Sequence, residues 1–232
     1  MYTNRILATS GIVLVLLTAG VVVAIRVFAA PAREDGDGLE FDRQIEGDRQ
    51  IEIERFTAIA LSGGWELHLT HAAEYSAVLI GDQDLVDTAE VSTAGDRLSI
   101  YFTDADEDRT ARIMITAPAI ETLSLAGVVN ATVVGLDAAE LTVRLDGATN
   151  LVFEDSTIGD LTLQTAGAGN IDLEESLVEN AVLAMAGANQ LRITMNGGSL
   201  TGRVEGVGNV RYSGETSSVN VDTEGIVRLR RR

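Results

Sequence analysis

A glycine recurs at almost constant intervals through the second half of this chain, and this repeat restricts the possible folds more than any other feature. Five segments align around it: LSLAGVVNATV, VRLDGATNLVF, LQTAGAGNIDL, LAMAGANQLRI and GRVEGVGNVRY. The repeated glycines are Gly127, Gly147, Gly167, Gly187, Gly206 and Gly225. A period of about 20 residues indicates stacked copies of one supersecondary unit.

Apolar residues alternate with polar ones on both sides of each glycine, which is the period of a strand and not of a helix. Four residues before the glycine stand Leu123, Val143, Leu163 and Leu183. Each unit is therefore predicted to contain a strand, a tight turn at the glycine, a second strand and a polar return such as EDSTIGD or EESLVEN. One such unit cannot bury its apolar face alone, whereas stacked units can.

These patterns predict an all-β fold, a parallel β-helix (a solenoid of ~20-residue rungs) with those four apolar residues in one internal column. A propeller is disfavoured, because each of its blades needs about 40 residues.

Asparagine stands three residues after most of the repeated glycines, with Gln190 and Arg228 in the other two positions. Asparagine tolerates the left-handed backbone region and hydrogen-bonds to nearby backbone, and stacked amides can bond from rung to rung. A surface row of sugar-contacting amides is the alternative, and the structural ladder is the preferred interpretation. The predicted turn and ladder residues are Gly127, Asn130, Gly147, Asn150, Gly167, Asn170, Gly187, Gly206 and Asn209.

The first half carries the same pattern once, in FTAIALSGGWELHLT, with Gly63 in the position of the repeated glycine and Trp65 as a packing residue. The stretch from Gly63 to Gly127 is expected to form about three irregular coils. SAVLIGD, RLSIYFTD and ARIMITAP are the strands expected within them.

A hydrophobic run from Ile6 to Ile25 precedes the repeats and is long enough, as a helix, to cross a bilayer. Residues 1–32 are predicted to be a transmembrane anchor, with a cleaved signal sequence as the alternative because Ala30-Pro31-Ala32 resembles a cleavage site. Residues 33–54 read as an acidic linker that becomes strand near Ile51, and residues 55–232 as the β-helix domain. The body is expected in the extracytoplasmic cell envelope, anchored by residues 6–25.

Charge and composition exclude several classes of function. The formal net charge of −18 argues against a nucleic-acid partner. Cysteine is absent and all 17 basic residues are arginine, which excludes disulfides, thiolate catalysis, lysine Schiff bases and a Walker-type phosphate loop.

No metal site or cofactor is predicted. His68 and His71 are three positions apart, which in a strand turns their rings to opposite faces. Asp104, Asp106 and Asp108 have the alternate spacing of a calcium loop but lack its glycine and terminal glutamate, so a polar turn is preferred.

No catalytic residues are predicted either. β-helix enzymes that cleave polysaccharides need clustered carboxylates. The acids here fall on the returns, where they keep the edge soluble: Glu154, Asp155, Glu174 and Glu175.

The basic segment RLRRR, residues 228–232, is predicted to deter edge-to-edge strand pairing. Contact with anionic lipid or an envelope polymer is the alternative.

The ordered series FTAIALSGGWELHLTH, GDQDLVDTAEVSTAGDRLSIYF and APAIETLSLAGVVNATVVG, followed by the G-x-x-N turns, resembles the bacterial auto-transporter adhesin head family, the head GIN domain. The resemblance covers about residues 55–228, and Gln190 and Arg228 depart from its asparagine pattern. It implies a right-handed parallel β-helix outside the cytoplasmic membrane, with an adhesive role.

The function expected from the residues and the resemblance together is a non-catalytic scaffold, adhesion-like or interaction module of the cell envelope. A carbohydrate-binding or carbohydrate-active β-helix is the alternative. The expected partners are the membrane, through the N-terminal helix, and an envelope protein, a glycan or a second copy of the chain.

Overall fold

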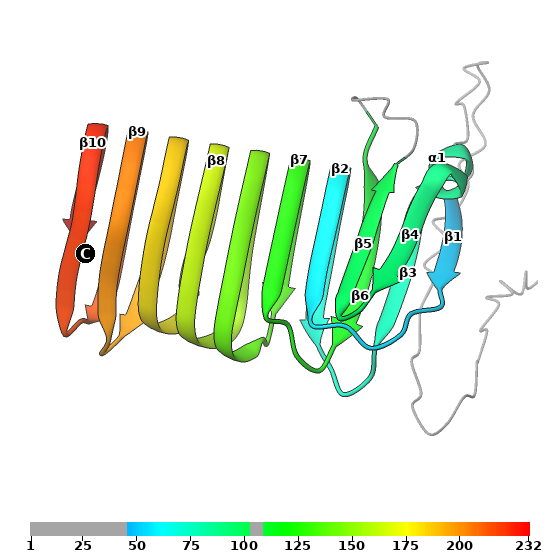
Figure 1. Cartoon of the computed structure of the whole chain (residues 1–232), viewed down its shortest axis with the longest axis horizontal. Coiled ribbons are helices and arrows are strands. Elements are labelled where there is room, and N and C mark those ends of the chain that lie inside the picture. Colours follow the sequence, from blue (N-terminus) through cyan, green and yellow to red (C-terminus); the bar gives the residue numbers. More distant parts are fainter. Residues whose placement is uncertain (1–45, 103–108) are drawn as a thin grey trace, which may run out of the picture. The chain divides into compact units, whose positions relative to one another are not determined.

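The computed structural model describes residues 46–102 and 109–232, which form one ten-stranded mixed sheet with almost no helix (Figure 1). The elements are β1 (Glu46–Ile51), β2 (Ala58–His71), β3 (Ser76–Asp82), α1 (Gln83–Thr88), β4 (Ala89–Ala94), β5 (Arg97–Phe102), β6 (Ala111–Ala117), β7 (Thr122–Val134), β8 (Asp137–Asn196), β9 (Ser199–Glu215) and β10 (Ser218–Arg231). The strand order is β1-β3-β6-β2-β7-β8-β9-β10, and β5 pairs with both β2 and β4.

Two sets of sequence predictions lie outside the described residues. They are the hydrophobic helix of residues 6–25 with its possible cleavage site, and the aspartates at positions 104, 106 and 108. In the part of the chain that is described, no helix is long and apolar enough to cross a membrane.

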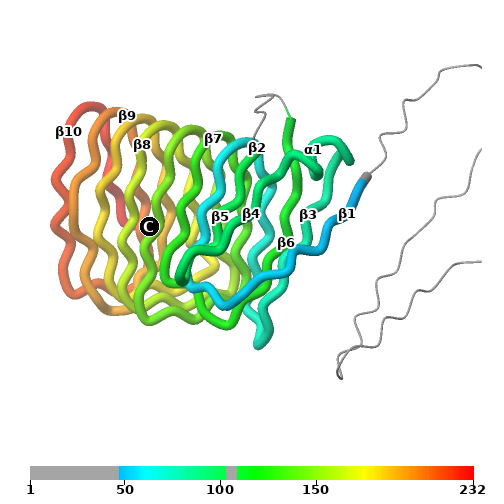
Figure 2. The backbone as a smooth tube through the Cα atoms, turned by 45° about the vertical axis from the view of Figure 1, so that its right-hand side comes forward, coloured from blue at the N-terminus to red at the C-terminus, as the bar shows by residue number. Residues whose placement is uncertain are grey.

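The repeat units pair in parallel, each one shifted by a single repeat from the last. Gly127 of β7 lies opposite Gly147 of β8, Gly187 of β8 opposite Gly206 of β9, and Gly206 opposite Gly225 of β10. β8 is 60 residues long and runs through three units, so that Figure 2 shows successive turns of chain side by side. Like residues therefore lie next to like residues along this part of the sheet.

The four residues of the predicted internal column are buried in one core, and Leu123 lies opposite Val143 in register. Leu123, Val143, Leu163 and Leu183 are each at most 1% exposed and belong to one core cluster. Burying a leucine or valine side chain contributes about 1.5–3 kcal/mol, so columns of this kind supply most of the stabilisation of a fold with few aromatic residues.

The polar returns differ from the prediction, because they are strand and they contribute to the core. Ser156 and Ser176 are buried, as are Ile158 and Val178, and the members of each pair occupy the same position in successive units. The Ser176 hydroxyl accepts a hydrogen bond from the Ser156 amide at 3.2 Å. From Ser156 to Ile158 the return alternates inward and outward as a strand does, and the alternation is interrupted at Asp155, which has a positive φ.

The prediction of about three coils between Gly63 and Gly127 is wrong. β2 and β7 are direct neighbours, and these two glycines lie opposite each other in register. The intervening strands SAVLIGD, RLSIYFTD and ARIMITAP do form, as β3, β5 and β6, but β3 pairs antiparallel with β6 and β4 pairs antiparallel with β5. The β4–β5 connection contains Gly95 at φ +60°, which allows a hairpin in place of a stacked coil.

The last part of the predicted linker, residues 33–54, contributes strand β1 to the sheet. β1 pairs antiparallel with β3 along its whole length, and Ile51 is buried. Leu85 and Val86 of the short helix α1 are buried in the same core cluster.

The repeated glycines have backbone φ values between +102° and +123° from Gly127 to Gly206, which is the region that favours glycine. A Cβ added to any of them would collide with the carbonyl oxygen of the glycine in the preceding unit. The asparagines do not share this conformation, because among the described non-glycine residues Asp155 alone has a positive φ. Their left-handed role is therefore a wrong prediction, and glycine alone makes the turn.

Candidate functional site

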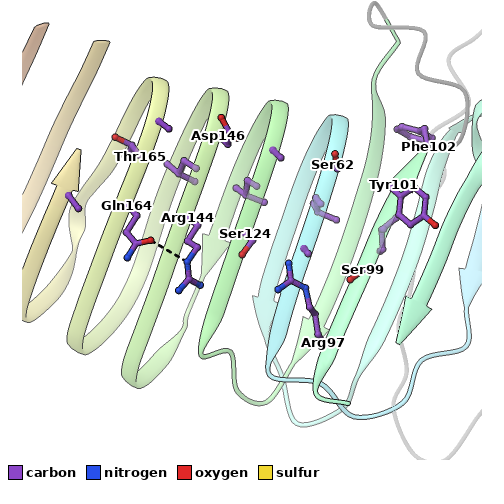
Figure 3. A pocket seen from close by; sticks show the side chains of 18 residues that line it. Ser62, Arg97, Ser99, Tyr101, Phe102, Ser124, Arg144, Asp146, Gln164 and Thr165 are labelled. Carbon is purple, nitrogen blue, oxygen red and sulfur yellow. Dashed lines mark hydrogen bonds between the residues drawn. The ribbon is translucent and has the colours of Figure 1, made fainter. Parts of the chain in front are cut away.

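An open groove of about 840 Å³ crosses the outer face of β5, β2, β7 and β8, and we call it the outer groove (Figure 3). Its polar and aromatic lining residues are Ser62, Arg97, Ser99, Tyr101, Phe102, Ser124, Arg144, Asp146, Gln164 and Thr165.

The outer groove exists because the central strands carry small outward side chains. Across the sheet, Ala60 lies between Ser99 and Ser124, and Ser62 lies between Tyr101 and Ala126. Ser124 and Ala126 in turn lie opposite Arg144 and Asp146 of β8. With the usual strand spacing of about 4.8 Å, the two central strands leave a floor about 14 Å wide between the larger side chains.

An aromatic wall closes the β5 side of the outer groove. The Phe102 ring stacks on buried Trp65, with centroids 4.2 Å apart and an interplanar angle of 11°. The Tyr101 hydroxyl donates a 2.6 Å hydrogen bond to Glu90 Oε2. This bond, together with the negative charge of the carboxylate, raises the pKa of Tyr101 above its usual value, so the phenol stays protonated.

The β8 side of the outer groove is polar and carries positive charge in an otherwise acidic protein. Arg144 Nε donates to Gln164 Oε1 at 3.2 Å, and exposed Arg97 faces it across the floor. Asp146 is the one carboxylate among the described residues that line the groove. The lining offers hydroxyl, guanidinium and aromatic groups that can make hydrogen bonds and stacking contacts.

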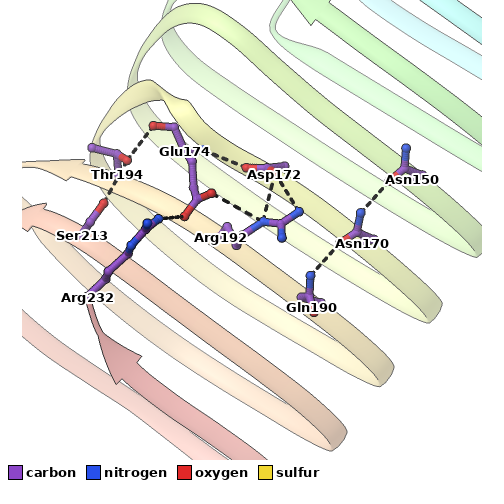
Figure 4. A network of polar contacts seen from close by, with 9 residues as sticks. All are labelled: Asn150, Asn170, Asp172, Glu174, Gln190, Arg192, Thr194, Ser213 and Arg232. Carbon is purple, nitrogen blue, oxygen red and sulfur yellow. Dashed lines mark hydrogen bonds and ion pairs between the residues drawn. The ribbon is translucent and has the colours of Figure 1, made fainter.

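Three of the amide residues three positions after the glycines form a hydrogen-bonded row (Figure 4). Asn170 Nδ2 donates to Asn150 Oδ1 at 2.6 Å, and Gln190 Nε2 donates to Asn170 Oδ1 at 3.1 Å. Asn130 lies in register with Asn150, and Asn209 in register with Gln190. A second, smaller groove of about 410 Å³ runs beside this row over the small residues Ala148, Ala168 and Ala188 and others.

We expect Asn170→Ala to lower the free energy of unfolding by about 1–2 kcal/mol, because one half-buried amide then leaves two partners without their hydrogen bonds. Urea unfolding followed by circular dichroism measures the change. Exposed Asn220 on β10 is the matched control, and Asn220→Ala should shift stability by less than about 0.5 kcal/mol. Equal midpoints for the two variants would contradict a stabilising row.

A second polar network lies beyond the amide row (Figure 4). Arg192 pairs with Asp172 at 2.8 Å and with Glu174 at 3.8 Å, and Arg232 reaches Glu174 at 2.9 Å. The acid Glu174, predicted only to keep a return soluble, therefore joins three units through ion pairs.

The two histidines make separate contacts. His68 Nε2 lies 3.2 Å from Glu66 Oε1, and His71 Nδ1 lies 3.0 Å from the carbonyl oxygen of Gly135. Hydrogen bonds from Arg112 and then from His68 lower the pKa of Glu66. Across the described ranges, no group of three or more histidine or acidic side chains has the geometry to hold a metal ion.

Of the asparagines predicted to form the ladder, Asn150 and Asn170 bond to each other, and the third member of the row is Gln190. The outer groove was not predicted from the sequence. Its signal was available in the outward positions that alternate with the apolar columns, where Ala60, Ser62, Ser124 and Ala126 are all small. Recognising it also required the pairing of β5 with β2, which connects segments that are distant in the sequence.

Comparison with known structures finds the same fold in a bacterial protein of low sequence identity. A crystal structure entitled a putative adhesin from Bacteroides fragilis is 16% identical, with a TM-score of 0.66 over 81% of this chain and 97% of that one. Putative adhesins from Parabacteroides distasonis (15% identity, TM-score 0.47, 81% and 98% covered) and Parabacteroides merdae (17%, 0.45, 81% and 96%) are also similar. Comparison with curated proteins gives no match.

The model of the family described as "Putative auto-transporter adhesin, head GIN domain" matches residues 55–216. This range takes in β2 to β9, including the whole outer groove and the amide row. The chain belongs to this head GIN domain family.

Proposed function

We propose that the protein is a non-catalytic, adhesion-like module of the bacterial cell envelope, built as a right-handed parallel β-helix of repeated rungs. Family membership supports the adhesive role and the extracytoplasmic location. The in-register parallel pairing of successive units supports the β-helix. We further propose that residues 6–25 anchor it in the membrane, and recovery of a mature protein lacking Tyr2 by mass spectrometry would refute this.

The observation that carries the proposal is the outer groove, whose chemistry suits holding a partner without changing it. Ser62, Ser99 and Ser124 offer hydroxyl groups along the floor, and Arg97 and Arg144 offer guanidinium donors. An aromatic ring stands at one side. A glycan of the envelope, with many hydroxyl groups and acidic substituents, is the partner that this combination favours.

We expect the double variant Arg97→Ala and Arg144→Ala to reduce binding at least about tenfold, because two charge-assisted contacts are lost. The measurement is binding of the full chain to a glycan array, followed by the affinity for the best acidic glycan. Arg211→Ala is the matched control, since this exposed arginine lies on β9 outside the groove. Unfolding midpoints of both variants show that the fold is intact.

Three outcomes would overturn the proposal. They are an array without any bound glycan, an equal loss of binding in the Arg211 control, and the release of shortened glycan on incubation, which would indicate an enzyme.

A further inference from the structure

β10 has one paired edge and one edge that no other described strand covers. It pairs in parallel with β9 along its full length of 14 residues and ends the strand order of the sheet. Its inward apolar residues Val221, Val227 and Leu229 pack on the core but are only partly buried. In the preceding unit, Val204 and Val210 are 1% exposed. The last column positions of the core are therefore left partly open at β10.

The charges of β10 are divided between its two halves. Outward-facing Asp222 and Glu224 precede Gly225, whereas outward-facing Arg228 and Arg230 follow it. All four side chains are exposed. Glu224 is bound by an arginine of β9 at 2.6 Å. A strand that is acidic in one half and basic in the other is complementary to itself when two copies run in opposite directions.

The other two arginines of the basic segment are directed back to the protein. Arg231 donates to the carbonyl oxygen of Gly214 at 2.9 Å, and Arg232 pairs with Glu174 at the same distance. Within the described ranges, the structure gives no such intramolecular ion pair to Arg228 or Arg230, which leaves them available on the outer face of β10.

We propose that two copies of this chain associate through β10, pairing antiparallel about a two-fold axis at Gly225. In this register Asp222 of one copy lies opposite Arg228 of the other, and the symmetry forms this ion pair twice. Val221 comes opposite Leu229 of the second copy, so the partly buried apolar residues at the end of each core are covered by those of the other copy. Gly225 has a φ of +97° and divides β10 into two arms of similar length, which the two-fold axis exchanges.

Two other arrangements are disfavoured by the same residues. Parallel pairing of β10 with another β10 would place Asp222 opposite Asp222 and Arg228 opposite Arg228, which is repulsive. Pairing with the opposite edge strand, β1, would match only 6 residues of the 14. The proposal thus departs from the prediction that the basic segment deters edge-to-edge pairing: the arginines would repel a basic edge but admit the acidic half of a second β10.

Charge reversal on the full chain tests the proposal, with the molecular mass measured by sedimentation across a concentration series. We expect wild type to form a dimer, and Asp222→Arg or Arg228→Asp alone to weaken the dimer at least about tenfold. The doubly substituted chain, with both changes, should recover the wild-type affinity because the pair is exchanged. Failure of the double variant to recover, or a wild type that stays monomeric, would overturn the proposal.

Disulfide trapping checks the register independently, because the chain contains no cysteine. Chains with Asp222→Cys and chains with Arg228→Cys are mixed and oxidised, and a covalent dimer is expected in the mixture more than in either alone. Equal cross-linking in all three samples would exclude the antiparallel register. Glycan binding by the outer groove is unaffected by these changes, so the two proposals can fail separately.

Discussion

Replacing Gly167 with alanine is expected to lower the free energy of unfolding by about 3–5 kcal/mol, enough to unfold a marginally stable domain. The added Cβ would collide with the carbonyl oxygen of Gly147 and lie 3.0 Å and 3.1 Å from its nitrogen and carbonyl carbon. These are backbone atoms of a paired strand and cannot turn aside as a side chain can. The φ of +123° adds strain for any residue with a Cβ.

Gly197 offers a control that separates the two causes. It also has a positive φ, at +95°, but a Cβ added there would meet no described atom within 4 Å. Gly197→Ala should therefore show the strain alone, about 1–2 kcal/mol. Urea unfolding of both variants measures the difference. If Gly167→Ala is no worse than Gly197→Ala, the close approach of successive units is not what requires glycine.

Removal of the Trp65 side chain is expected to cost a similar amount, about 3–5 kcal/mol. The residue is completely buried, stacks on Phe102, and its Nε1 donates to the Ser62 carbonyl oxygen at 3.0 Å. Trp65→Ala leaves a cavity, removes the hydrogen bond to the Ser62 carbonyl oxygen and takes away the stacking partner of the Phe102 ring. Because Phe102 lines the outer groove, we also expect weaker glycan binding, measured on the same array.

Trp65→Phe is the matched variant for this prediction, because it retains an aromatic ring against Phe102 while losing the indole nitrogen. A loss of about 1–2 kcal/mol is expected for it. Since the chain has a single tryptophan, circular dichroism and not fluorescence must follow unfolding. A Trp65→Ala variant as stable as Trp65→Phe would show that the stacked pair contributes little.

The side chain of Asn189 hydrogen-bonds to the turn at Gly187 in the same way as Trp65 does to the turn at Gly63. Its Nδ2 donates at 3.0 Å to the carbonyl oxygen of Ala186, three positions earlier, just as Trp65 donates to Ser62. Both residues follow a repeated glycine by two positions. Two chemically unrelated side chains thus donate to equivalent carbonyl oxygens, each of the residue just before the repeated glycine. A comparison of the local sequences does not reveal this equivalence.

The repeat made the second half of the chain predictable, because its signal is local. Leu123 and Val143 could be placed in one column since a strict period fixes both register and direction. Between Gly63 and Gly127 no period exists, and strand partners there are set by packing across distant segments. The neighbours β2 and β7 could not be derived for that reason.

The outer groove is built partly from the periodic repeats and partly from the segment without a period. Its β7 and β8 residues follow from the repeat, whereas Arg97 and Tyr101 reach it through a hairpin whose position depends on non-local pairing. The amide row, in contrast, needed only the register of the glycines. The stacking of amides from one unit to the next was predictable, whereas the backbone φ of the asparagines was not.

In-register pairing of equal units also determines how such a protein can change in size. Each repeat contacts its two neighbours through the same columns and the same glycine approach. Duplicating or deleting one whole unit therefore changes the width of the sheet by one strand spacing, about 4.8 Å, while the contacts between the remaining units are unchanged. Evolution can adjust the extent of the outer surface in fixed steps, without redesigning the interior each time.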